Sequence, residues 1–414
     1  MKLHRKTFVA GGAHTSYLGK FHPDFIWKGH PEFGKKDNPT IEQYLKTITD
    51  ATLASTGVDP ELIDKAYVAN FAGECFINQG HLGAALAGSH PALAHKPIMR
   101  VEGACASGGL ALVSAIDAIQ AGFDAVLVVG AEIQNSANAK VGADYLARAA
   151  HYASERSIDP FTFPCLFAKR AKALYAAFGI TEEDVAQLAV KAYNNANRNP
   201  FAHMRTVKMS LADALSSPKF LENPEYKDFL RVSGCSQVSD GASAVILLSE
   251  EGARKAGLLR DQLVEVLGYG HATGSLYQLE DELELTNTRK AAERLYADTG
   301  ISAQDVQVAE VHDCFSVTEI MMYEALGFAA RGQGVGLVRE GATQIDGKIP
   351  VNTGGGLVAF GHPVGATGVK QALELYRQLK GQAGAYQVAG NPNIGVAANM
   401  GGNDRTAVVT AYRA

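Results

Sequence analysis

The chain has 414 residues, of which 47% are apolar and 20% charged, and its formal net charge at pH 7 is −5. This length is too great for one ordinary hydrophobic core and predicts two or three packed units. The sequence has no basic run interleaved with aromatic residues, no apolar leader at its N-terminus and no stretch of about 18 uncharged apolar residues. We therefore expect a cytoplasmic protein that binds neither nucleic acid nor a membrane.

Hydrophobic periodicity predicts alternating strands and helices along the first third of the chain. The predicted strands are Lys6–Ala13, Ala66–Ala72, Pro97–Glu102 and Ala125–Glu132, and the predicted helices are Ile41–Thr56 and Ser107–Gly122. The polar and aromatic segment His14–Thr40 also contains His22 and His30. Because no cysteine or carboxylate pairing supports these histidines as metal ligands, we expect a packed surface or subunit-contact loop.

From about Asn135 to Arg231 the strand pattern gives way to helical stretches, which predicts an inserted helical layer. Helices are expected at Asp144–Glu155, Ala168–Phe178 and Thr181–Ala196. The last of these opens with a threonine cap and an acidic first turn, both typical of a helix N-terminus.

Strands and helices alternate again in the second half of the chain. Strands are predicted at Ser243–Ser249, Leu263–Tyr269, Val306–Val311, Ile394–Ala398 and Thr406–Tyr412, and helices at Thr286–Thr299, Val317–Ala325 and Val369–Leu379. The segments SDGASAVILLSEEGA (239–253) and NDRTAVVTAYRA (403–414) look like the same element twice. This repetition favours a duplicated α/β unit.

The five cysteines are widely spaced and form no C-x-x-C pair, which disfavours a zinc site or a disulfide framework. Cys105 lies where a predicted strand gives way to a predicted helix, within GACASGG (103–109). Unpaired N–H groups and the positive dipole end of a helix favour a thiolate, so we expect a lowered pKa for Cys105 and a nucleophilic role. A buried structural cysteine in a tight turn is the alternative interpretation.

Three later segments can complete a cysteine-based acyl-transfer site. His362, on a glycine-rich turn, can take a proton from Cys105 and then donate to a carbonyl oxygen. His312 and Cys314 alternate at the end of a predicted strand and can face the same side, where a second thiol can act as acid or base. The turn NMGGND (399–404) carries backbone N–H groups that can hold an oxyanion. Each segment also has an ordinary structural interpretation, as a packed residue or a glycine turn.

In combination and in this order, these motifs resemble those of thiolases. The motifs are CAS at Cys105–Ser107, HDCF at His312–Phe315, GHP at Gly361–Pro363 and the glycine-rich turn that ends at Asp404. HDCF is similar to the sterol-carrier-protein type of thiolase, whereas other thiolases have an NEAF-like motif and a cysteine in the last loop. Asn399 and Gly401 stand where the cysteine and glycine of that C-x-G motif would be. Residues 181–200 and 234–253 also resemble thiolase segments, so the resemblance covers nearly the whole chain.

The resemblance implies the α/β thiolase fold, in which two βαβαβαββ halves pack in a five-layered αβαβα arrangement with an inserted helical loop domain. It places the N-terminal half at residues 1–134 and 232–262, the loop domain at 135–231 and the C-terminal half at 263–414. It also implies a homodimer or homotetramer and a role in lipid metabolism.

The chemistry implied is that of an acyltransferase of the acetyl-CoA C-acyltransferase type, with acyl-CoA thioesters as substrates and no metal. Such an enzyme cleaves a 3-ketoacyl-CoA with coenzyme A, or carries out the reverse Claisen condensation, through an acyl-cysteine. Cys105 would be the nucleophile, His362 would activate it and contribute to an oxyanion hole, and Cys314 would act as acid and base at the α-carbon.

The remaining site residues follow from the same resemblance. His312 would hold the water that completes the first oxyanion hole. The backbone N–H groups of Cys105 and Gly401 would form the second hole, and Ser236 would lie near the pantetheine arm.

Two other functions fit parts of the pattern. A carrier-protein-dependent ketoacyl synthase would need a histidine or asparagine in place of Cys314, so HDCF disfavours it. A partner-dependent or non-catalytic acyl-CoA-binding subunit of a larger complex fits the missing C-x-G cysteine, and a fold alone does not fix function. The presence of Cys105, Cys314 and His362 argues against this second alternative. The sequence leaves the acyl chain and the physiological direction open.

Overall fold

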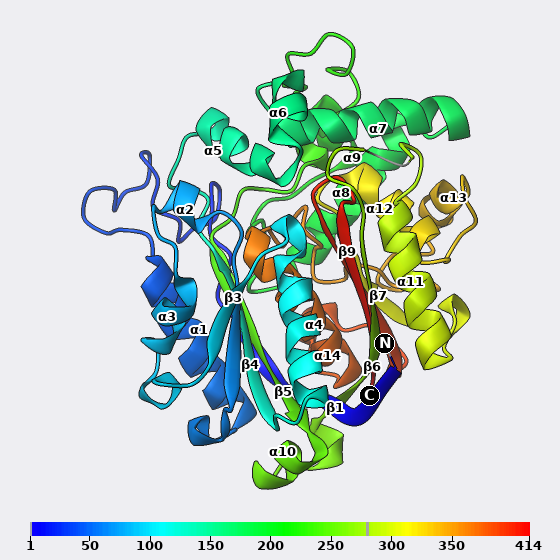
Figure 1. The fold of residues 1–414 in the computed structure, drawn as a ribbon. Helices are drawn as coiled ribbons and strands as arrows, with labels where there is room; N and C mark the ends of the chain where they lie inside the picture. Colours follow the sequence, from blue (N-terminus) through cyan, green and yellow to red (C-terminus); the bar gives the residue numbers. More distant parts are fainter. Residues whose placement is uncertain (1, 279–280) are drawn as a thin grey trace.

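The computed structural model describes residues 2–278 and 281–414, and nine strands of this part of the chain pair in the order β3-β2-β4-β5-β1-β6-β9-β8-β7 (Figure 1). The strands are β1 (Lys2–His14), β2 (Lys65–Ala69), β3 (Ile98–Val101), β4 (Ala125–Glu132), β5 (Gly241–Ser249), β6 (Val264–Thr273), β7 (Val308–Glu310), β8 (Ile394–Gly401) and β9 (Thr406–Arg413). The sheet therefore runs without a break through both halves of the chain.

The strand order repeats in the two halves. In the first half β3, β2 and β4 are parallel, and β5 and β1 follow in antiparallel pairings. In the second half β7 and β8 are parallel, β9 and β6 follow antiparallel, and a bridge between Ala309 and Val351 stands where the first half has β3. Antiparallel pairing of β1 with β6 joins the halves. The duplication predicted from the sequence is thus visible in the topology.

Helices cover the sheet on both faces and lie between its two halves. The helices are α1 (Ile41–Thr56), α2 (Gly73–Phe76), α3 (Leu82–Ala87), α4 (Ser107–Gln120), α5 (Ala139–Leu146), α6 (Tyr152–Glu155), α7 (Thr162–Phe178), α8 (Glu182–Ala196), α9 (Leu211–Ser216), α10 (Glu250–Lys255), α11 (Thr286–Thr299), α12 (Ser316–Ala325), α13 (Gly334–Arg339) and α14 (Thr367–Leu379). Helix α1 begins with a capping box in which Thr40 and Gln43 satisfy each other's backbone N–H groups.

Alternation along the strands builds the layers. In β4, Val126 and Val128 belong to the core that includes α4 and α14, whereas Leu127 and Val129 belong to the core that includes α1 and α3. In β9, Val408 belongs to the core that includes α4 and α14, whereas Ala407 and Val409 belong to the core that includes α11 and α12. Helices α4 and α14 therefore lie between the strands of the two halves, which gives the five layers αβαβα (Figure 1).

The segment between β4 and β5 carries α5 to α9, and these helices lie across one end of the layers (Figure 1). The predicted boundaries at residues 134, 231 and 262 stay a prediction. Within the described residues, no helix is both long and apolar enough to cross a membrane.

The predicted helix Asp144–Glu155 is wrong. The structure has two short helices there, α5 and α6, separated by a 3-10 turn and an extended Ala150 with φ −104° and ψ 176°. The carbonyl oxygen of Ala149 packs so closely on Gly402 that a Cβ there would lie 2.7 Å from it. A tertiary contact therefore overrides the helical tendency of this segment.

Two further predictions need correction. Strand β7 ends at Glu310, so His312 and Cys314 lie beyond it and their predicted alternation on a strand does not apply. His14 belongs to β1 rather than to the following loop, and its Nε2 lies 3.0 Å from the buried carboxylate of Glu374.

Candidate active site

Cys105 lies at a sharp turn between β3 and α4. The residue before it, Ala104, has φ +53°, in the left-handed region that residues with a side chain rarely adopt. The hydroxyl of Ser107 stabilises this turn because it accepts from the Gly103 N–H at 3.0 Å and donates to the Ala104 carbonyl at 2.6 Å. The carboxylate of Glu102 accepts from the Ala104 N–H at 2.6 Å. The strained turn is therefore held by several contacts.

The pKa of Cys105 is raised, and the sequence prediction of a lowered pKa is wrong. Burial is the main cause, and it raises the pKa of the thiol to about 12. The carboxylate of Glu132 adds to the increase, whereas the backbone N–H groups of Gly402 and of Cys105 itself oppose it. The helix terminus does supply favourable N–H groups, but the enclosure of the sulfur outweighs them. The resting residue is therefore a thiol.

Close contact between α4 and α14 brings the turn of His362 to Cys105. A Cβ on Gly108 would lie 2.6 Å from the backbone nitrogen of Gly368, so both helices need glycine at their N-terminal ends. His362 lies just before α14, and its Nδ1 is 2.6 Å from the hydroxyl of Thr367. Burial lowers the pKa of His362 to about 3, with a smaller effect from Lys370. The imidazole is therefore neutral.

His312 is buried after β7, with its Nδ1 3.1 Å from Nδ2 of Asn399. Burial, followed by His362 and Lys370, lowers the pKa of His312 well below its ordinary value. The Asn399 Nδ2 group also donates to the carbonyl of Cys105 at 3.0 Å. Asn399 thus links two of the segments that the sequence predicted to meet.

The structure brings Cys105, His312 and His362 together. The thiol sulfur and one nitrogen of each ring lie within 4.8 Å of one another. The two imidazoles meet edge to face, with centroids 5.2 Å apart and planes at 87°. These atom types also bind zinc, so the sequence prediction that the site holds no metal stays a prediction.

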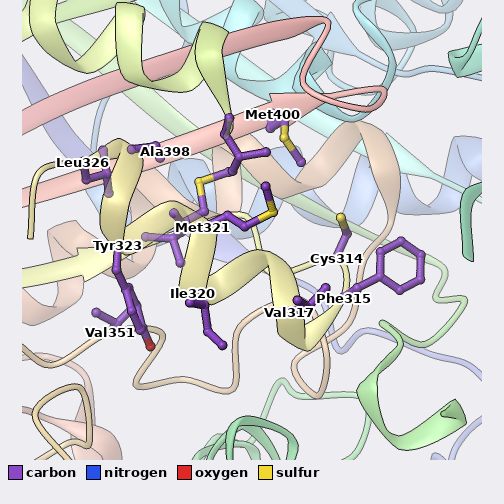
Figure 2. Packing of buried hydrophobic residues seen from close by; sticks show 14 of the residues in the cluster. Cys314, Phe315, Val317, Ile320, Met321, Tyr323, Leu326, Val351, Ala398 and Met400 are labelled. Atoms are coloured by element: carbon purple, nitrogen blue, oxygen red, sulfur yellow. The ribbon is translucent and has the colours of Figure 1, made fainter. Parts of the chain in front are cut away.

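Cys314 lies at the edge of this group and is not one of the three converging residues. It is 7% exposed, begins the turn into α12 beside Phe315, and belongs to the hydrophobic cluster that also contains Met321 and Met400 (Figure 2). Burial raises the pKa of Cys314 well above its ordinary value, and the nearby Cys105 adds to this. The backbone N–H of Ser236 donates to the Cys314 carbonyl at 2.9 Å, which places Ser236 directly beside this turn.

Gly401 packs against the turn of Cys105. A Cβ at this position would lie 2.2 Å from the carbonyl oxygen of Gly103, which explains the glycine by close approach. Within this glycine-rich turn, the backbone N–H that reaches the Cys105 sulfur is that of the next residue, Gly402. Sequence analysis missed Gly402 although it lies in the same NMGGND segment. It also missed the contacts of Thr367 with His362 and of Asn399 with His312, because a sequence motif does not show which side chain contacts which ring nitrogen.

The family assignment follows from comparisons with known proteins. The thiolase N-terminal domain family matches residues 30–209, and the thiolase C-terminal domain-like family matches residues 268–413. An acetyl-CoA acetyltransferase of Methanothermobacter thermautotrophicus is 37% identical over 372 residues, which cover 88% of this chain and 93% of that protein. The chain belongs to the thiolase family. As the relatives are acyltransferases, this thiolase is an acyltransferase enzyme.

A second relative agrees with this assignment, and two solved structures have a similar fold. Sterol carrier protein 2 of Rattus norvegicus is 34% identical over 77% of this thiolase and 58% of that protein. The structure of the Ltp2-ChsH2(DUF35) aldolase has a TM-score of 0.76 at 21% identity and covers 98% of this chain and 97% of its own. The structure of human mitochondrial 3-ketoacyl-CoA thiolase has a TM-score of 0.68 at 16% identity and covers 99% of both chains. The resemblance to the sterol-carrier type and the predicted thiolase fold are both confirmed.

Proposed function

We propose that this thiolase cleaves a 3-ketoacyl-CoA with coenzyme A, or forms one in the reverse Claisen condensation, through an acyl group on Cys105. The convergence of the Cys105 thiol with nitrogens of His312 and His362 within 4.8 Å is the observation that carries the proposal. The neutral His362 is the base that a resting thiol with a raised pKa requires.

In the cleavage direction, the sulfur of Cys105 attacks the 3-keto carbon while His362 takes the thiol proton. The bond between C2 and C3 then breaks. The acyl group stays on sulfur, and the bonding electrons form the enolate of the leaving acyl-CoA. Cys314 donates a proton to that carbon and becomes a thiolate.

Coenzyme A completes the cycle. Its thiol gives a proton to Cys314 and its sulfur attacks the acyl group, while His362 returns the first proton to Cys105. Because one thioester replaces another, the exchange is nearly balanced in energy and can run in both directions.

Charge on oxygen needs fixed donors during these steps. His362 and a water held by His312 would stabilise the enolate oxygen. The N–H groups of Cys105 and Gly401 would stabilise the acyl carbonyl, together with the N–H of Gly402, which reaches the Cys105 sulfur. One such donor typically lowers a barrier by about 3–4 kcal/mol. Ser236, beside the Cys314 turn, would contact the pantetheine arm.

The test is the intact mass of the protein after incubation with acetyl-CoA and a panel of 3-ketoacyl-CoAs, followed by peptide mapping. An acyl adduct on Cys105 is expected, and it should disappear in Cys105→Ser but persist in Cys75→Ser, which removes another half-buried thiol. The chain length that labels best would identify the substrate class. An adduct that survives in Cys105→Ser would overturn the assignment of the nucleophile.

The second candidate is a partner-dependent or non-catalytic acyl-CoA-binding subunit of a larger complex. Asn399 in place of a cysteine supports it, as does the similarity of fold to an aldolase solved with a second component. Folded protein that forms no adduct with any thioester would favour this candidate. The first proposal includes three further predictions. These are a homodimer or homotetramer, a cytoplasmic location and a role in lipid metabolism.

A further inference from the structure

The two active-site histidines are held by different kinds of partner at Nδ1. His312 contacts the side-chain amide of Asn399 at 3.1 Å, and His362 contacts the hydroxyl of Thr367 at 2.6 Å. A neutral imidazole carries one proton, so the partner at Nδ1 decides whether Nε2 donates or accepts. The contacts of each partner settle which case applies.

The amide of Asn399 has a fixed orientation. Its Oδ1 accepts from the backbone N–H of Gly109 at 3.0 Å, a group that can only donate. Its Nδ2 donates to the carbonyl of Cys105 at 3.0 Å, a group that can only accept. The second hydrogen of Nδ2 therefore points to Nδ1 of His312, which has to be the acceptor. The proton of His312 is then on Nε2.

The hydroxyl of Thr367 has the opposite effect on His362. Its oxygen lies 3.2 Å from the carbonyl of Pro363, which can only accept, and 2.6 Å from Nδ1 of His362, which can donate or accept. Both contacts are hydrogen bonds only if the hydroxyl donates to Pro363 and accepts from Nδ1 of His362. Nδ1 of His362 is therefore the donor, and its Nε2 carries a lone pair.

We propose that Asn399 and Thr367 are positioning residues that give the two histidines opposite and fixed roles: His312 is a hydrogen-bond donor at Nε2, and His362 is a proton acceptor at Nε2. This inference deepens the proposed function and rests on it for its chemical meaning. Only His362 can take the proton of Cys105, although a nitrogen of His312 also lies within 4.8 Å of the sulfur. Only His312 presents an N–H to an oxyanion, or to the water that holds one, before any proton has moved.

The first test reads the tautomers directly and needs no activity. In protein labelled with 15N in histidine, the ring resonances of His312 and His362 are assigned by loss of signal in His312→Gln and His362→Gln. The expected spectrum has a protonated Nε2 and a bare Nδ1 for His312, and the reverse for His362. A protonated Nδ1 on His312 in the unmodified enzyme would overturn the proposal, whatever its reaction proves to be.

The second test separates the two half-reactions. Asn399→Asp keeps an acceptor for Gly109 but replaces the Nδ2 donor by an oxygen, so the proton of His312 should move to Nδ1. Exchange of the α-hydrogens of acetyl-CoA with D2O should then fall about 100-fold, as for loss of an oxyanion donor. Acylation of Cys105 should fall far less. An equal fall in the rates of exchange and acylation would indicate that Asn399 has only a structural role.

Variants of Thr367 should show the opposite selectivity. Thr367→Val removes the acceptor for Nδ1 of His362 and should slow acylation of Cys105 about 100-fold, the range of a positioned general base. Thr367→Ser restores the hydroxyl and should recover most of that loss. Failure of serine to rescue would contradict the role of the hydroxyl.

Asn195→Asp is the matched control for Asn399→Asp. Its amide is also buried, but it donates to the backbone carbonyl of Asn352 at 3.1 Å and to neither histidine. It should leave the histidine resonances in place and the ratio of the two half-reactions unchanged.

Discussion

Glu132, at the end of β4, accepts a hydrogen bond at 3.0 Å from the backbone N–H of Gly365, in the turn that carries His362. The same carboxylate accepts from the N–H groups of Phe71 at 2.8 Å and Ala72 at 3.1 Å. One buried acid therefore links the first half of the chain to the turn of His362 in the second half. Burial dominates over these donors and raises the pKa of Glu132 to about 7.

The raised pKa of Glu132 predicts a pH-dependent part of the free energy of unfolding. The folded state holds this proton up to about pH 7, whereas the unfolded state releases it near 4.5. The stabilisation is present below pH 4.5 and is lost as the pH rises to about 7, in total roughly 3 kcal/mol. Glu132→Gln cannot titrate, so urea unfolding from pH 4.5 to 7.5 should show a flatter pH dependence in this variant.

Glu42→Gln, in the exposed first turn of α1, should keep the unmodified slope. Identical slopes in all three proteins would contradict the assignment.

Local sequence patterns predicted much of the framework. The strand Ala125–Glu132 and the helices Ile41–Thr56 and Thr286–Thr299 were predicted with their observed bounds. Each has a clear apolar face or a capping residue that acts within a few positions. The helix Asp144–Glu155 failed because its break depends on Gly402, which is distant in sequence.

The sequence predicted which residues meet in the site better than it predicted their pKa values. Cys105, His312 and His362 do meet, as their motifs implied. The pKa of Cys105 was predicted in the wrong direction because enclosure by the second half of the chain cannot be read from one turn. Asn399 was noted only as a missing cysteine, and its contacts with Cys105 and His312 became visible through the fold.

The raised pKa of Cys105 predicts how its alkylation depends on pH. Since the thiol has a pKa of about 12 and His362 one of about 3, no stable ion pair forms at rest. The rate of iodoacetamide reaction at Cys105 should rise about tenfold per pH unit from pH 7 to 10, with the thiolate fraction. Mass spectrometry of the Cys105 peptide against time measures this rate. A plateau below pH 8 would mean that the thiolate forms at rest, as the helix terminus alone would suggest.

Cys314→Ala is expected to separate the two chemical steps. Acylation of Cys105 should stay within about threefold of the unmodified rate, because His362 is still present as the base. In the proposed mechanism Cys314 donates its proton only after the acyl group is on the Cys105 sulfur. Complete turnover should fall at least about 100-fold, the lower range for removal of a general acid or base. Acylation is measured by intact mass, and complete turnover by the coenzyme A-dependent loss of a 3-ketoacyl-CoA. Cys165→Ala, which removes a buried thiol of α7, serves as control. Loss of acylation in Cys314→Ala would refute the division of roles between the two cysteines.

Gly401→Ala tests whether close packing holds the nucleophile in place. The new methyl group would lie 2.2 Å from the carbonyl oxygen of Gly103 and 3.0 Å from Cβ of Ala106, so the turn of Cys105 has to move away. We expect a loss of about 1–3 kcal/mol in the free energy of unfolding, as for overpacking of a well-filled core. Acylation should fall about 100-fold, since a displacement of this size moves the thiol away from His362.

Gly336→Ala is the matched control, because it adds the same methyl group within α13, where no described heavy atom beyond its chain neighbours and the backbone of its own helix lies within 4 Å. It should gain about 0.5–1 kcal/mol from the lower entropy of the unfolded chain and leave acylation unchanged. Thermal unfolding and the initial rate of Cys105 acylation compare the two variants. If Gly401→Ala acylates at the unmodified rate, the turn tolerates displacement and the placement of the thiol does not depend on this contact. If it loses acylation while its stability matches that of the control, the glycine acts through the geometry of Cys105 rather than through folding.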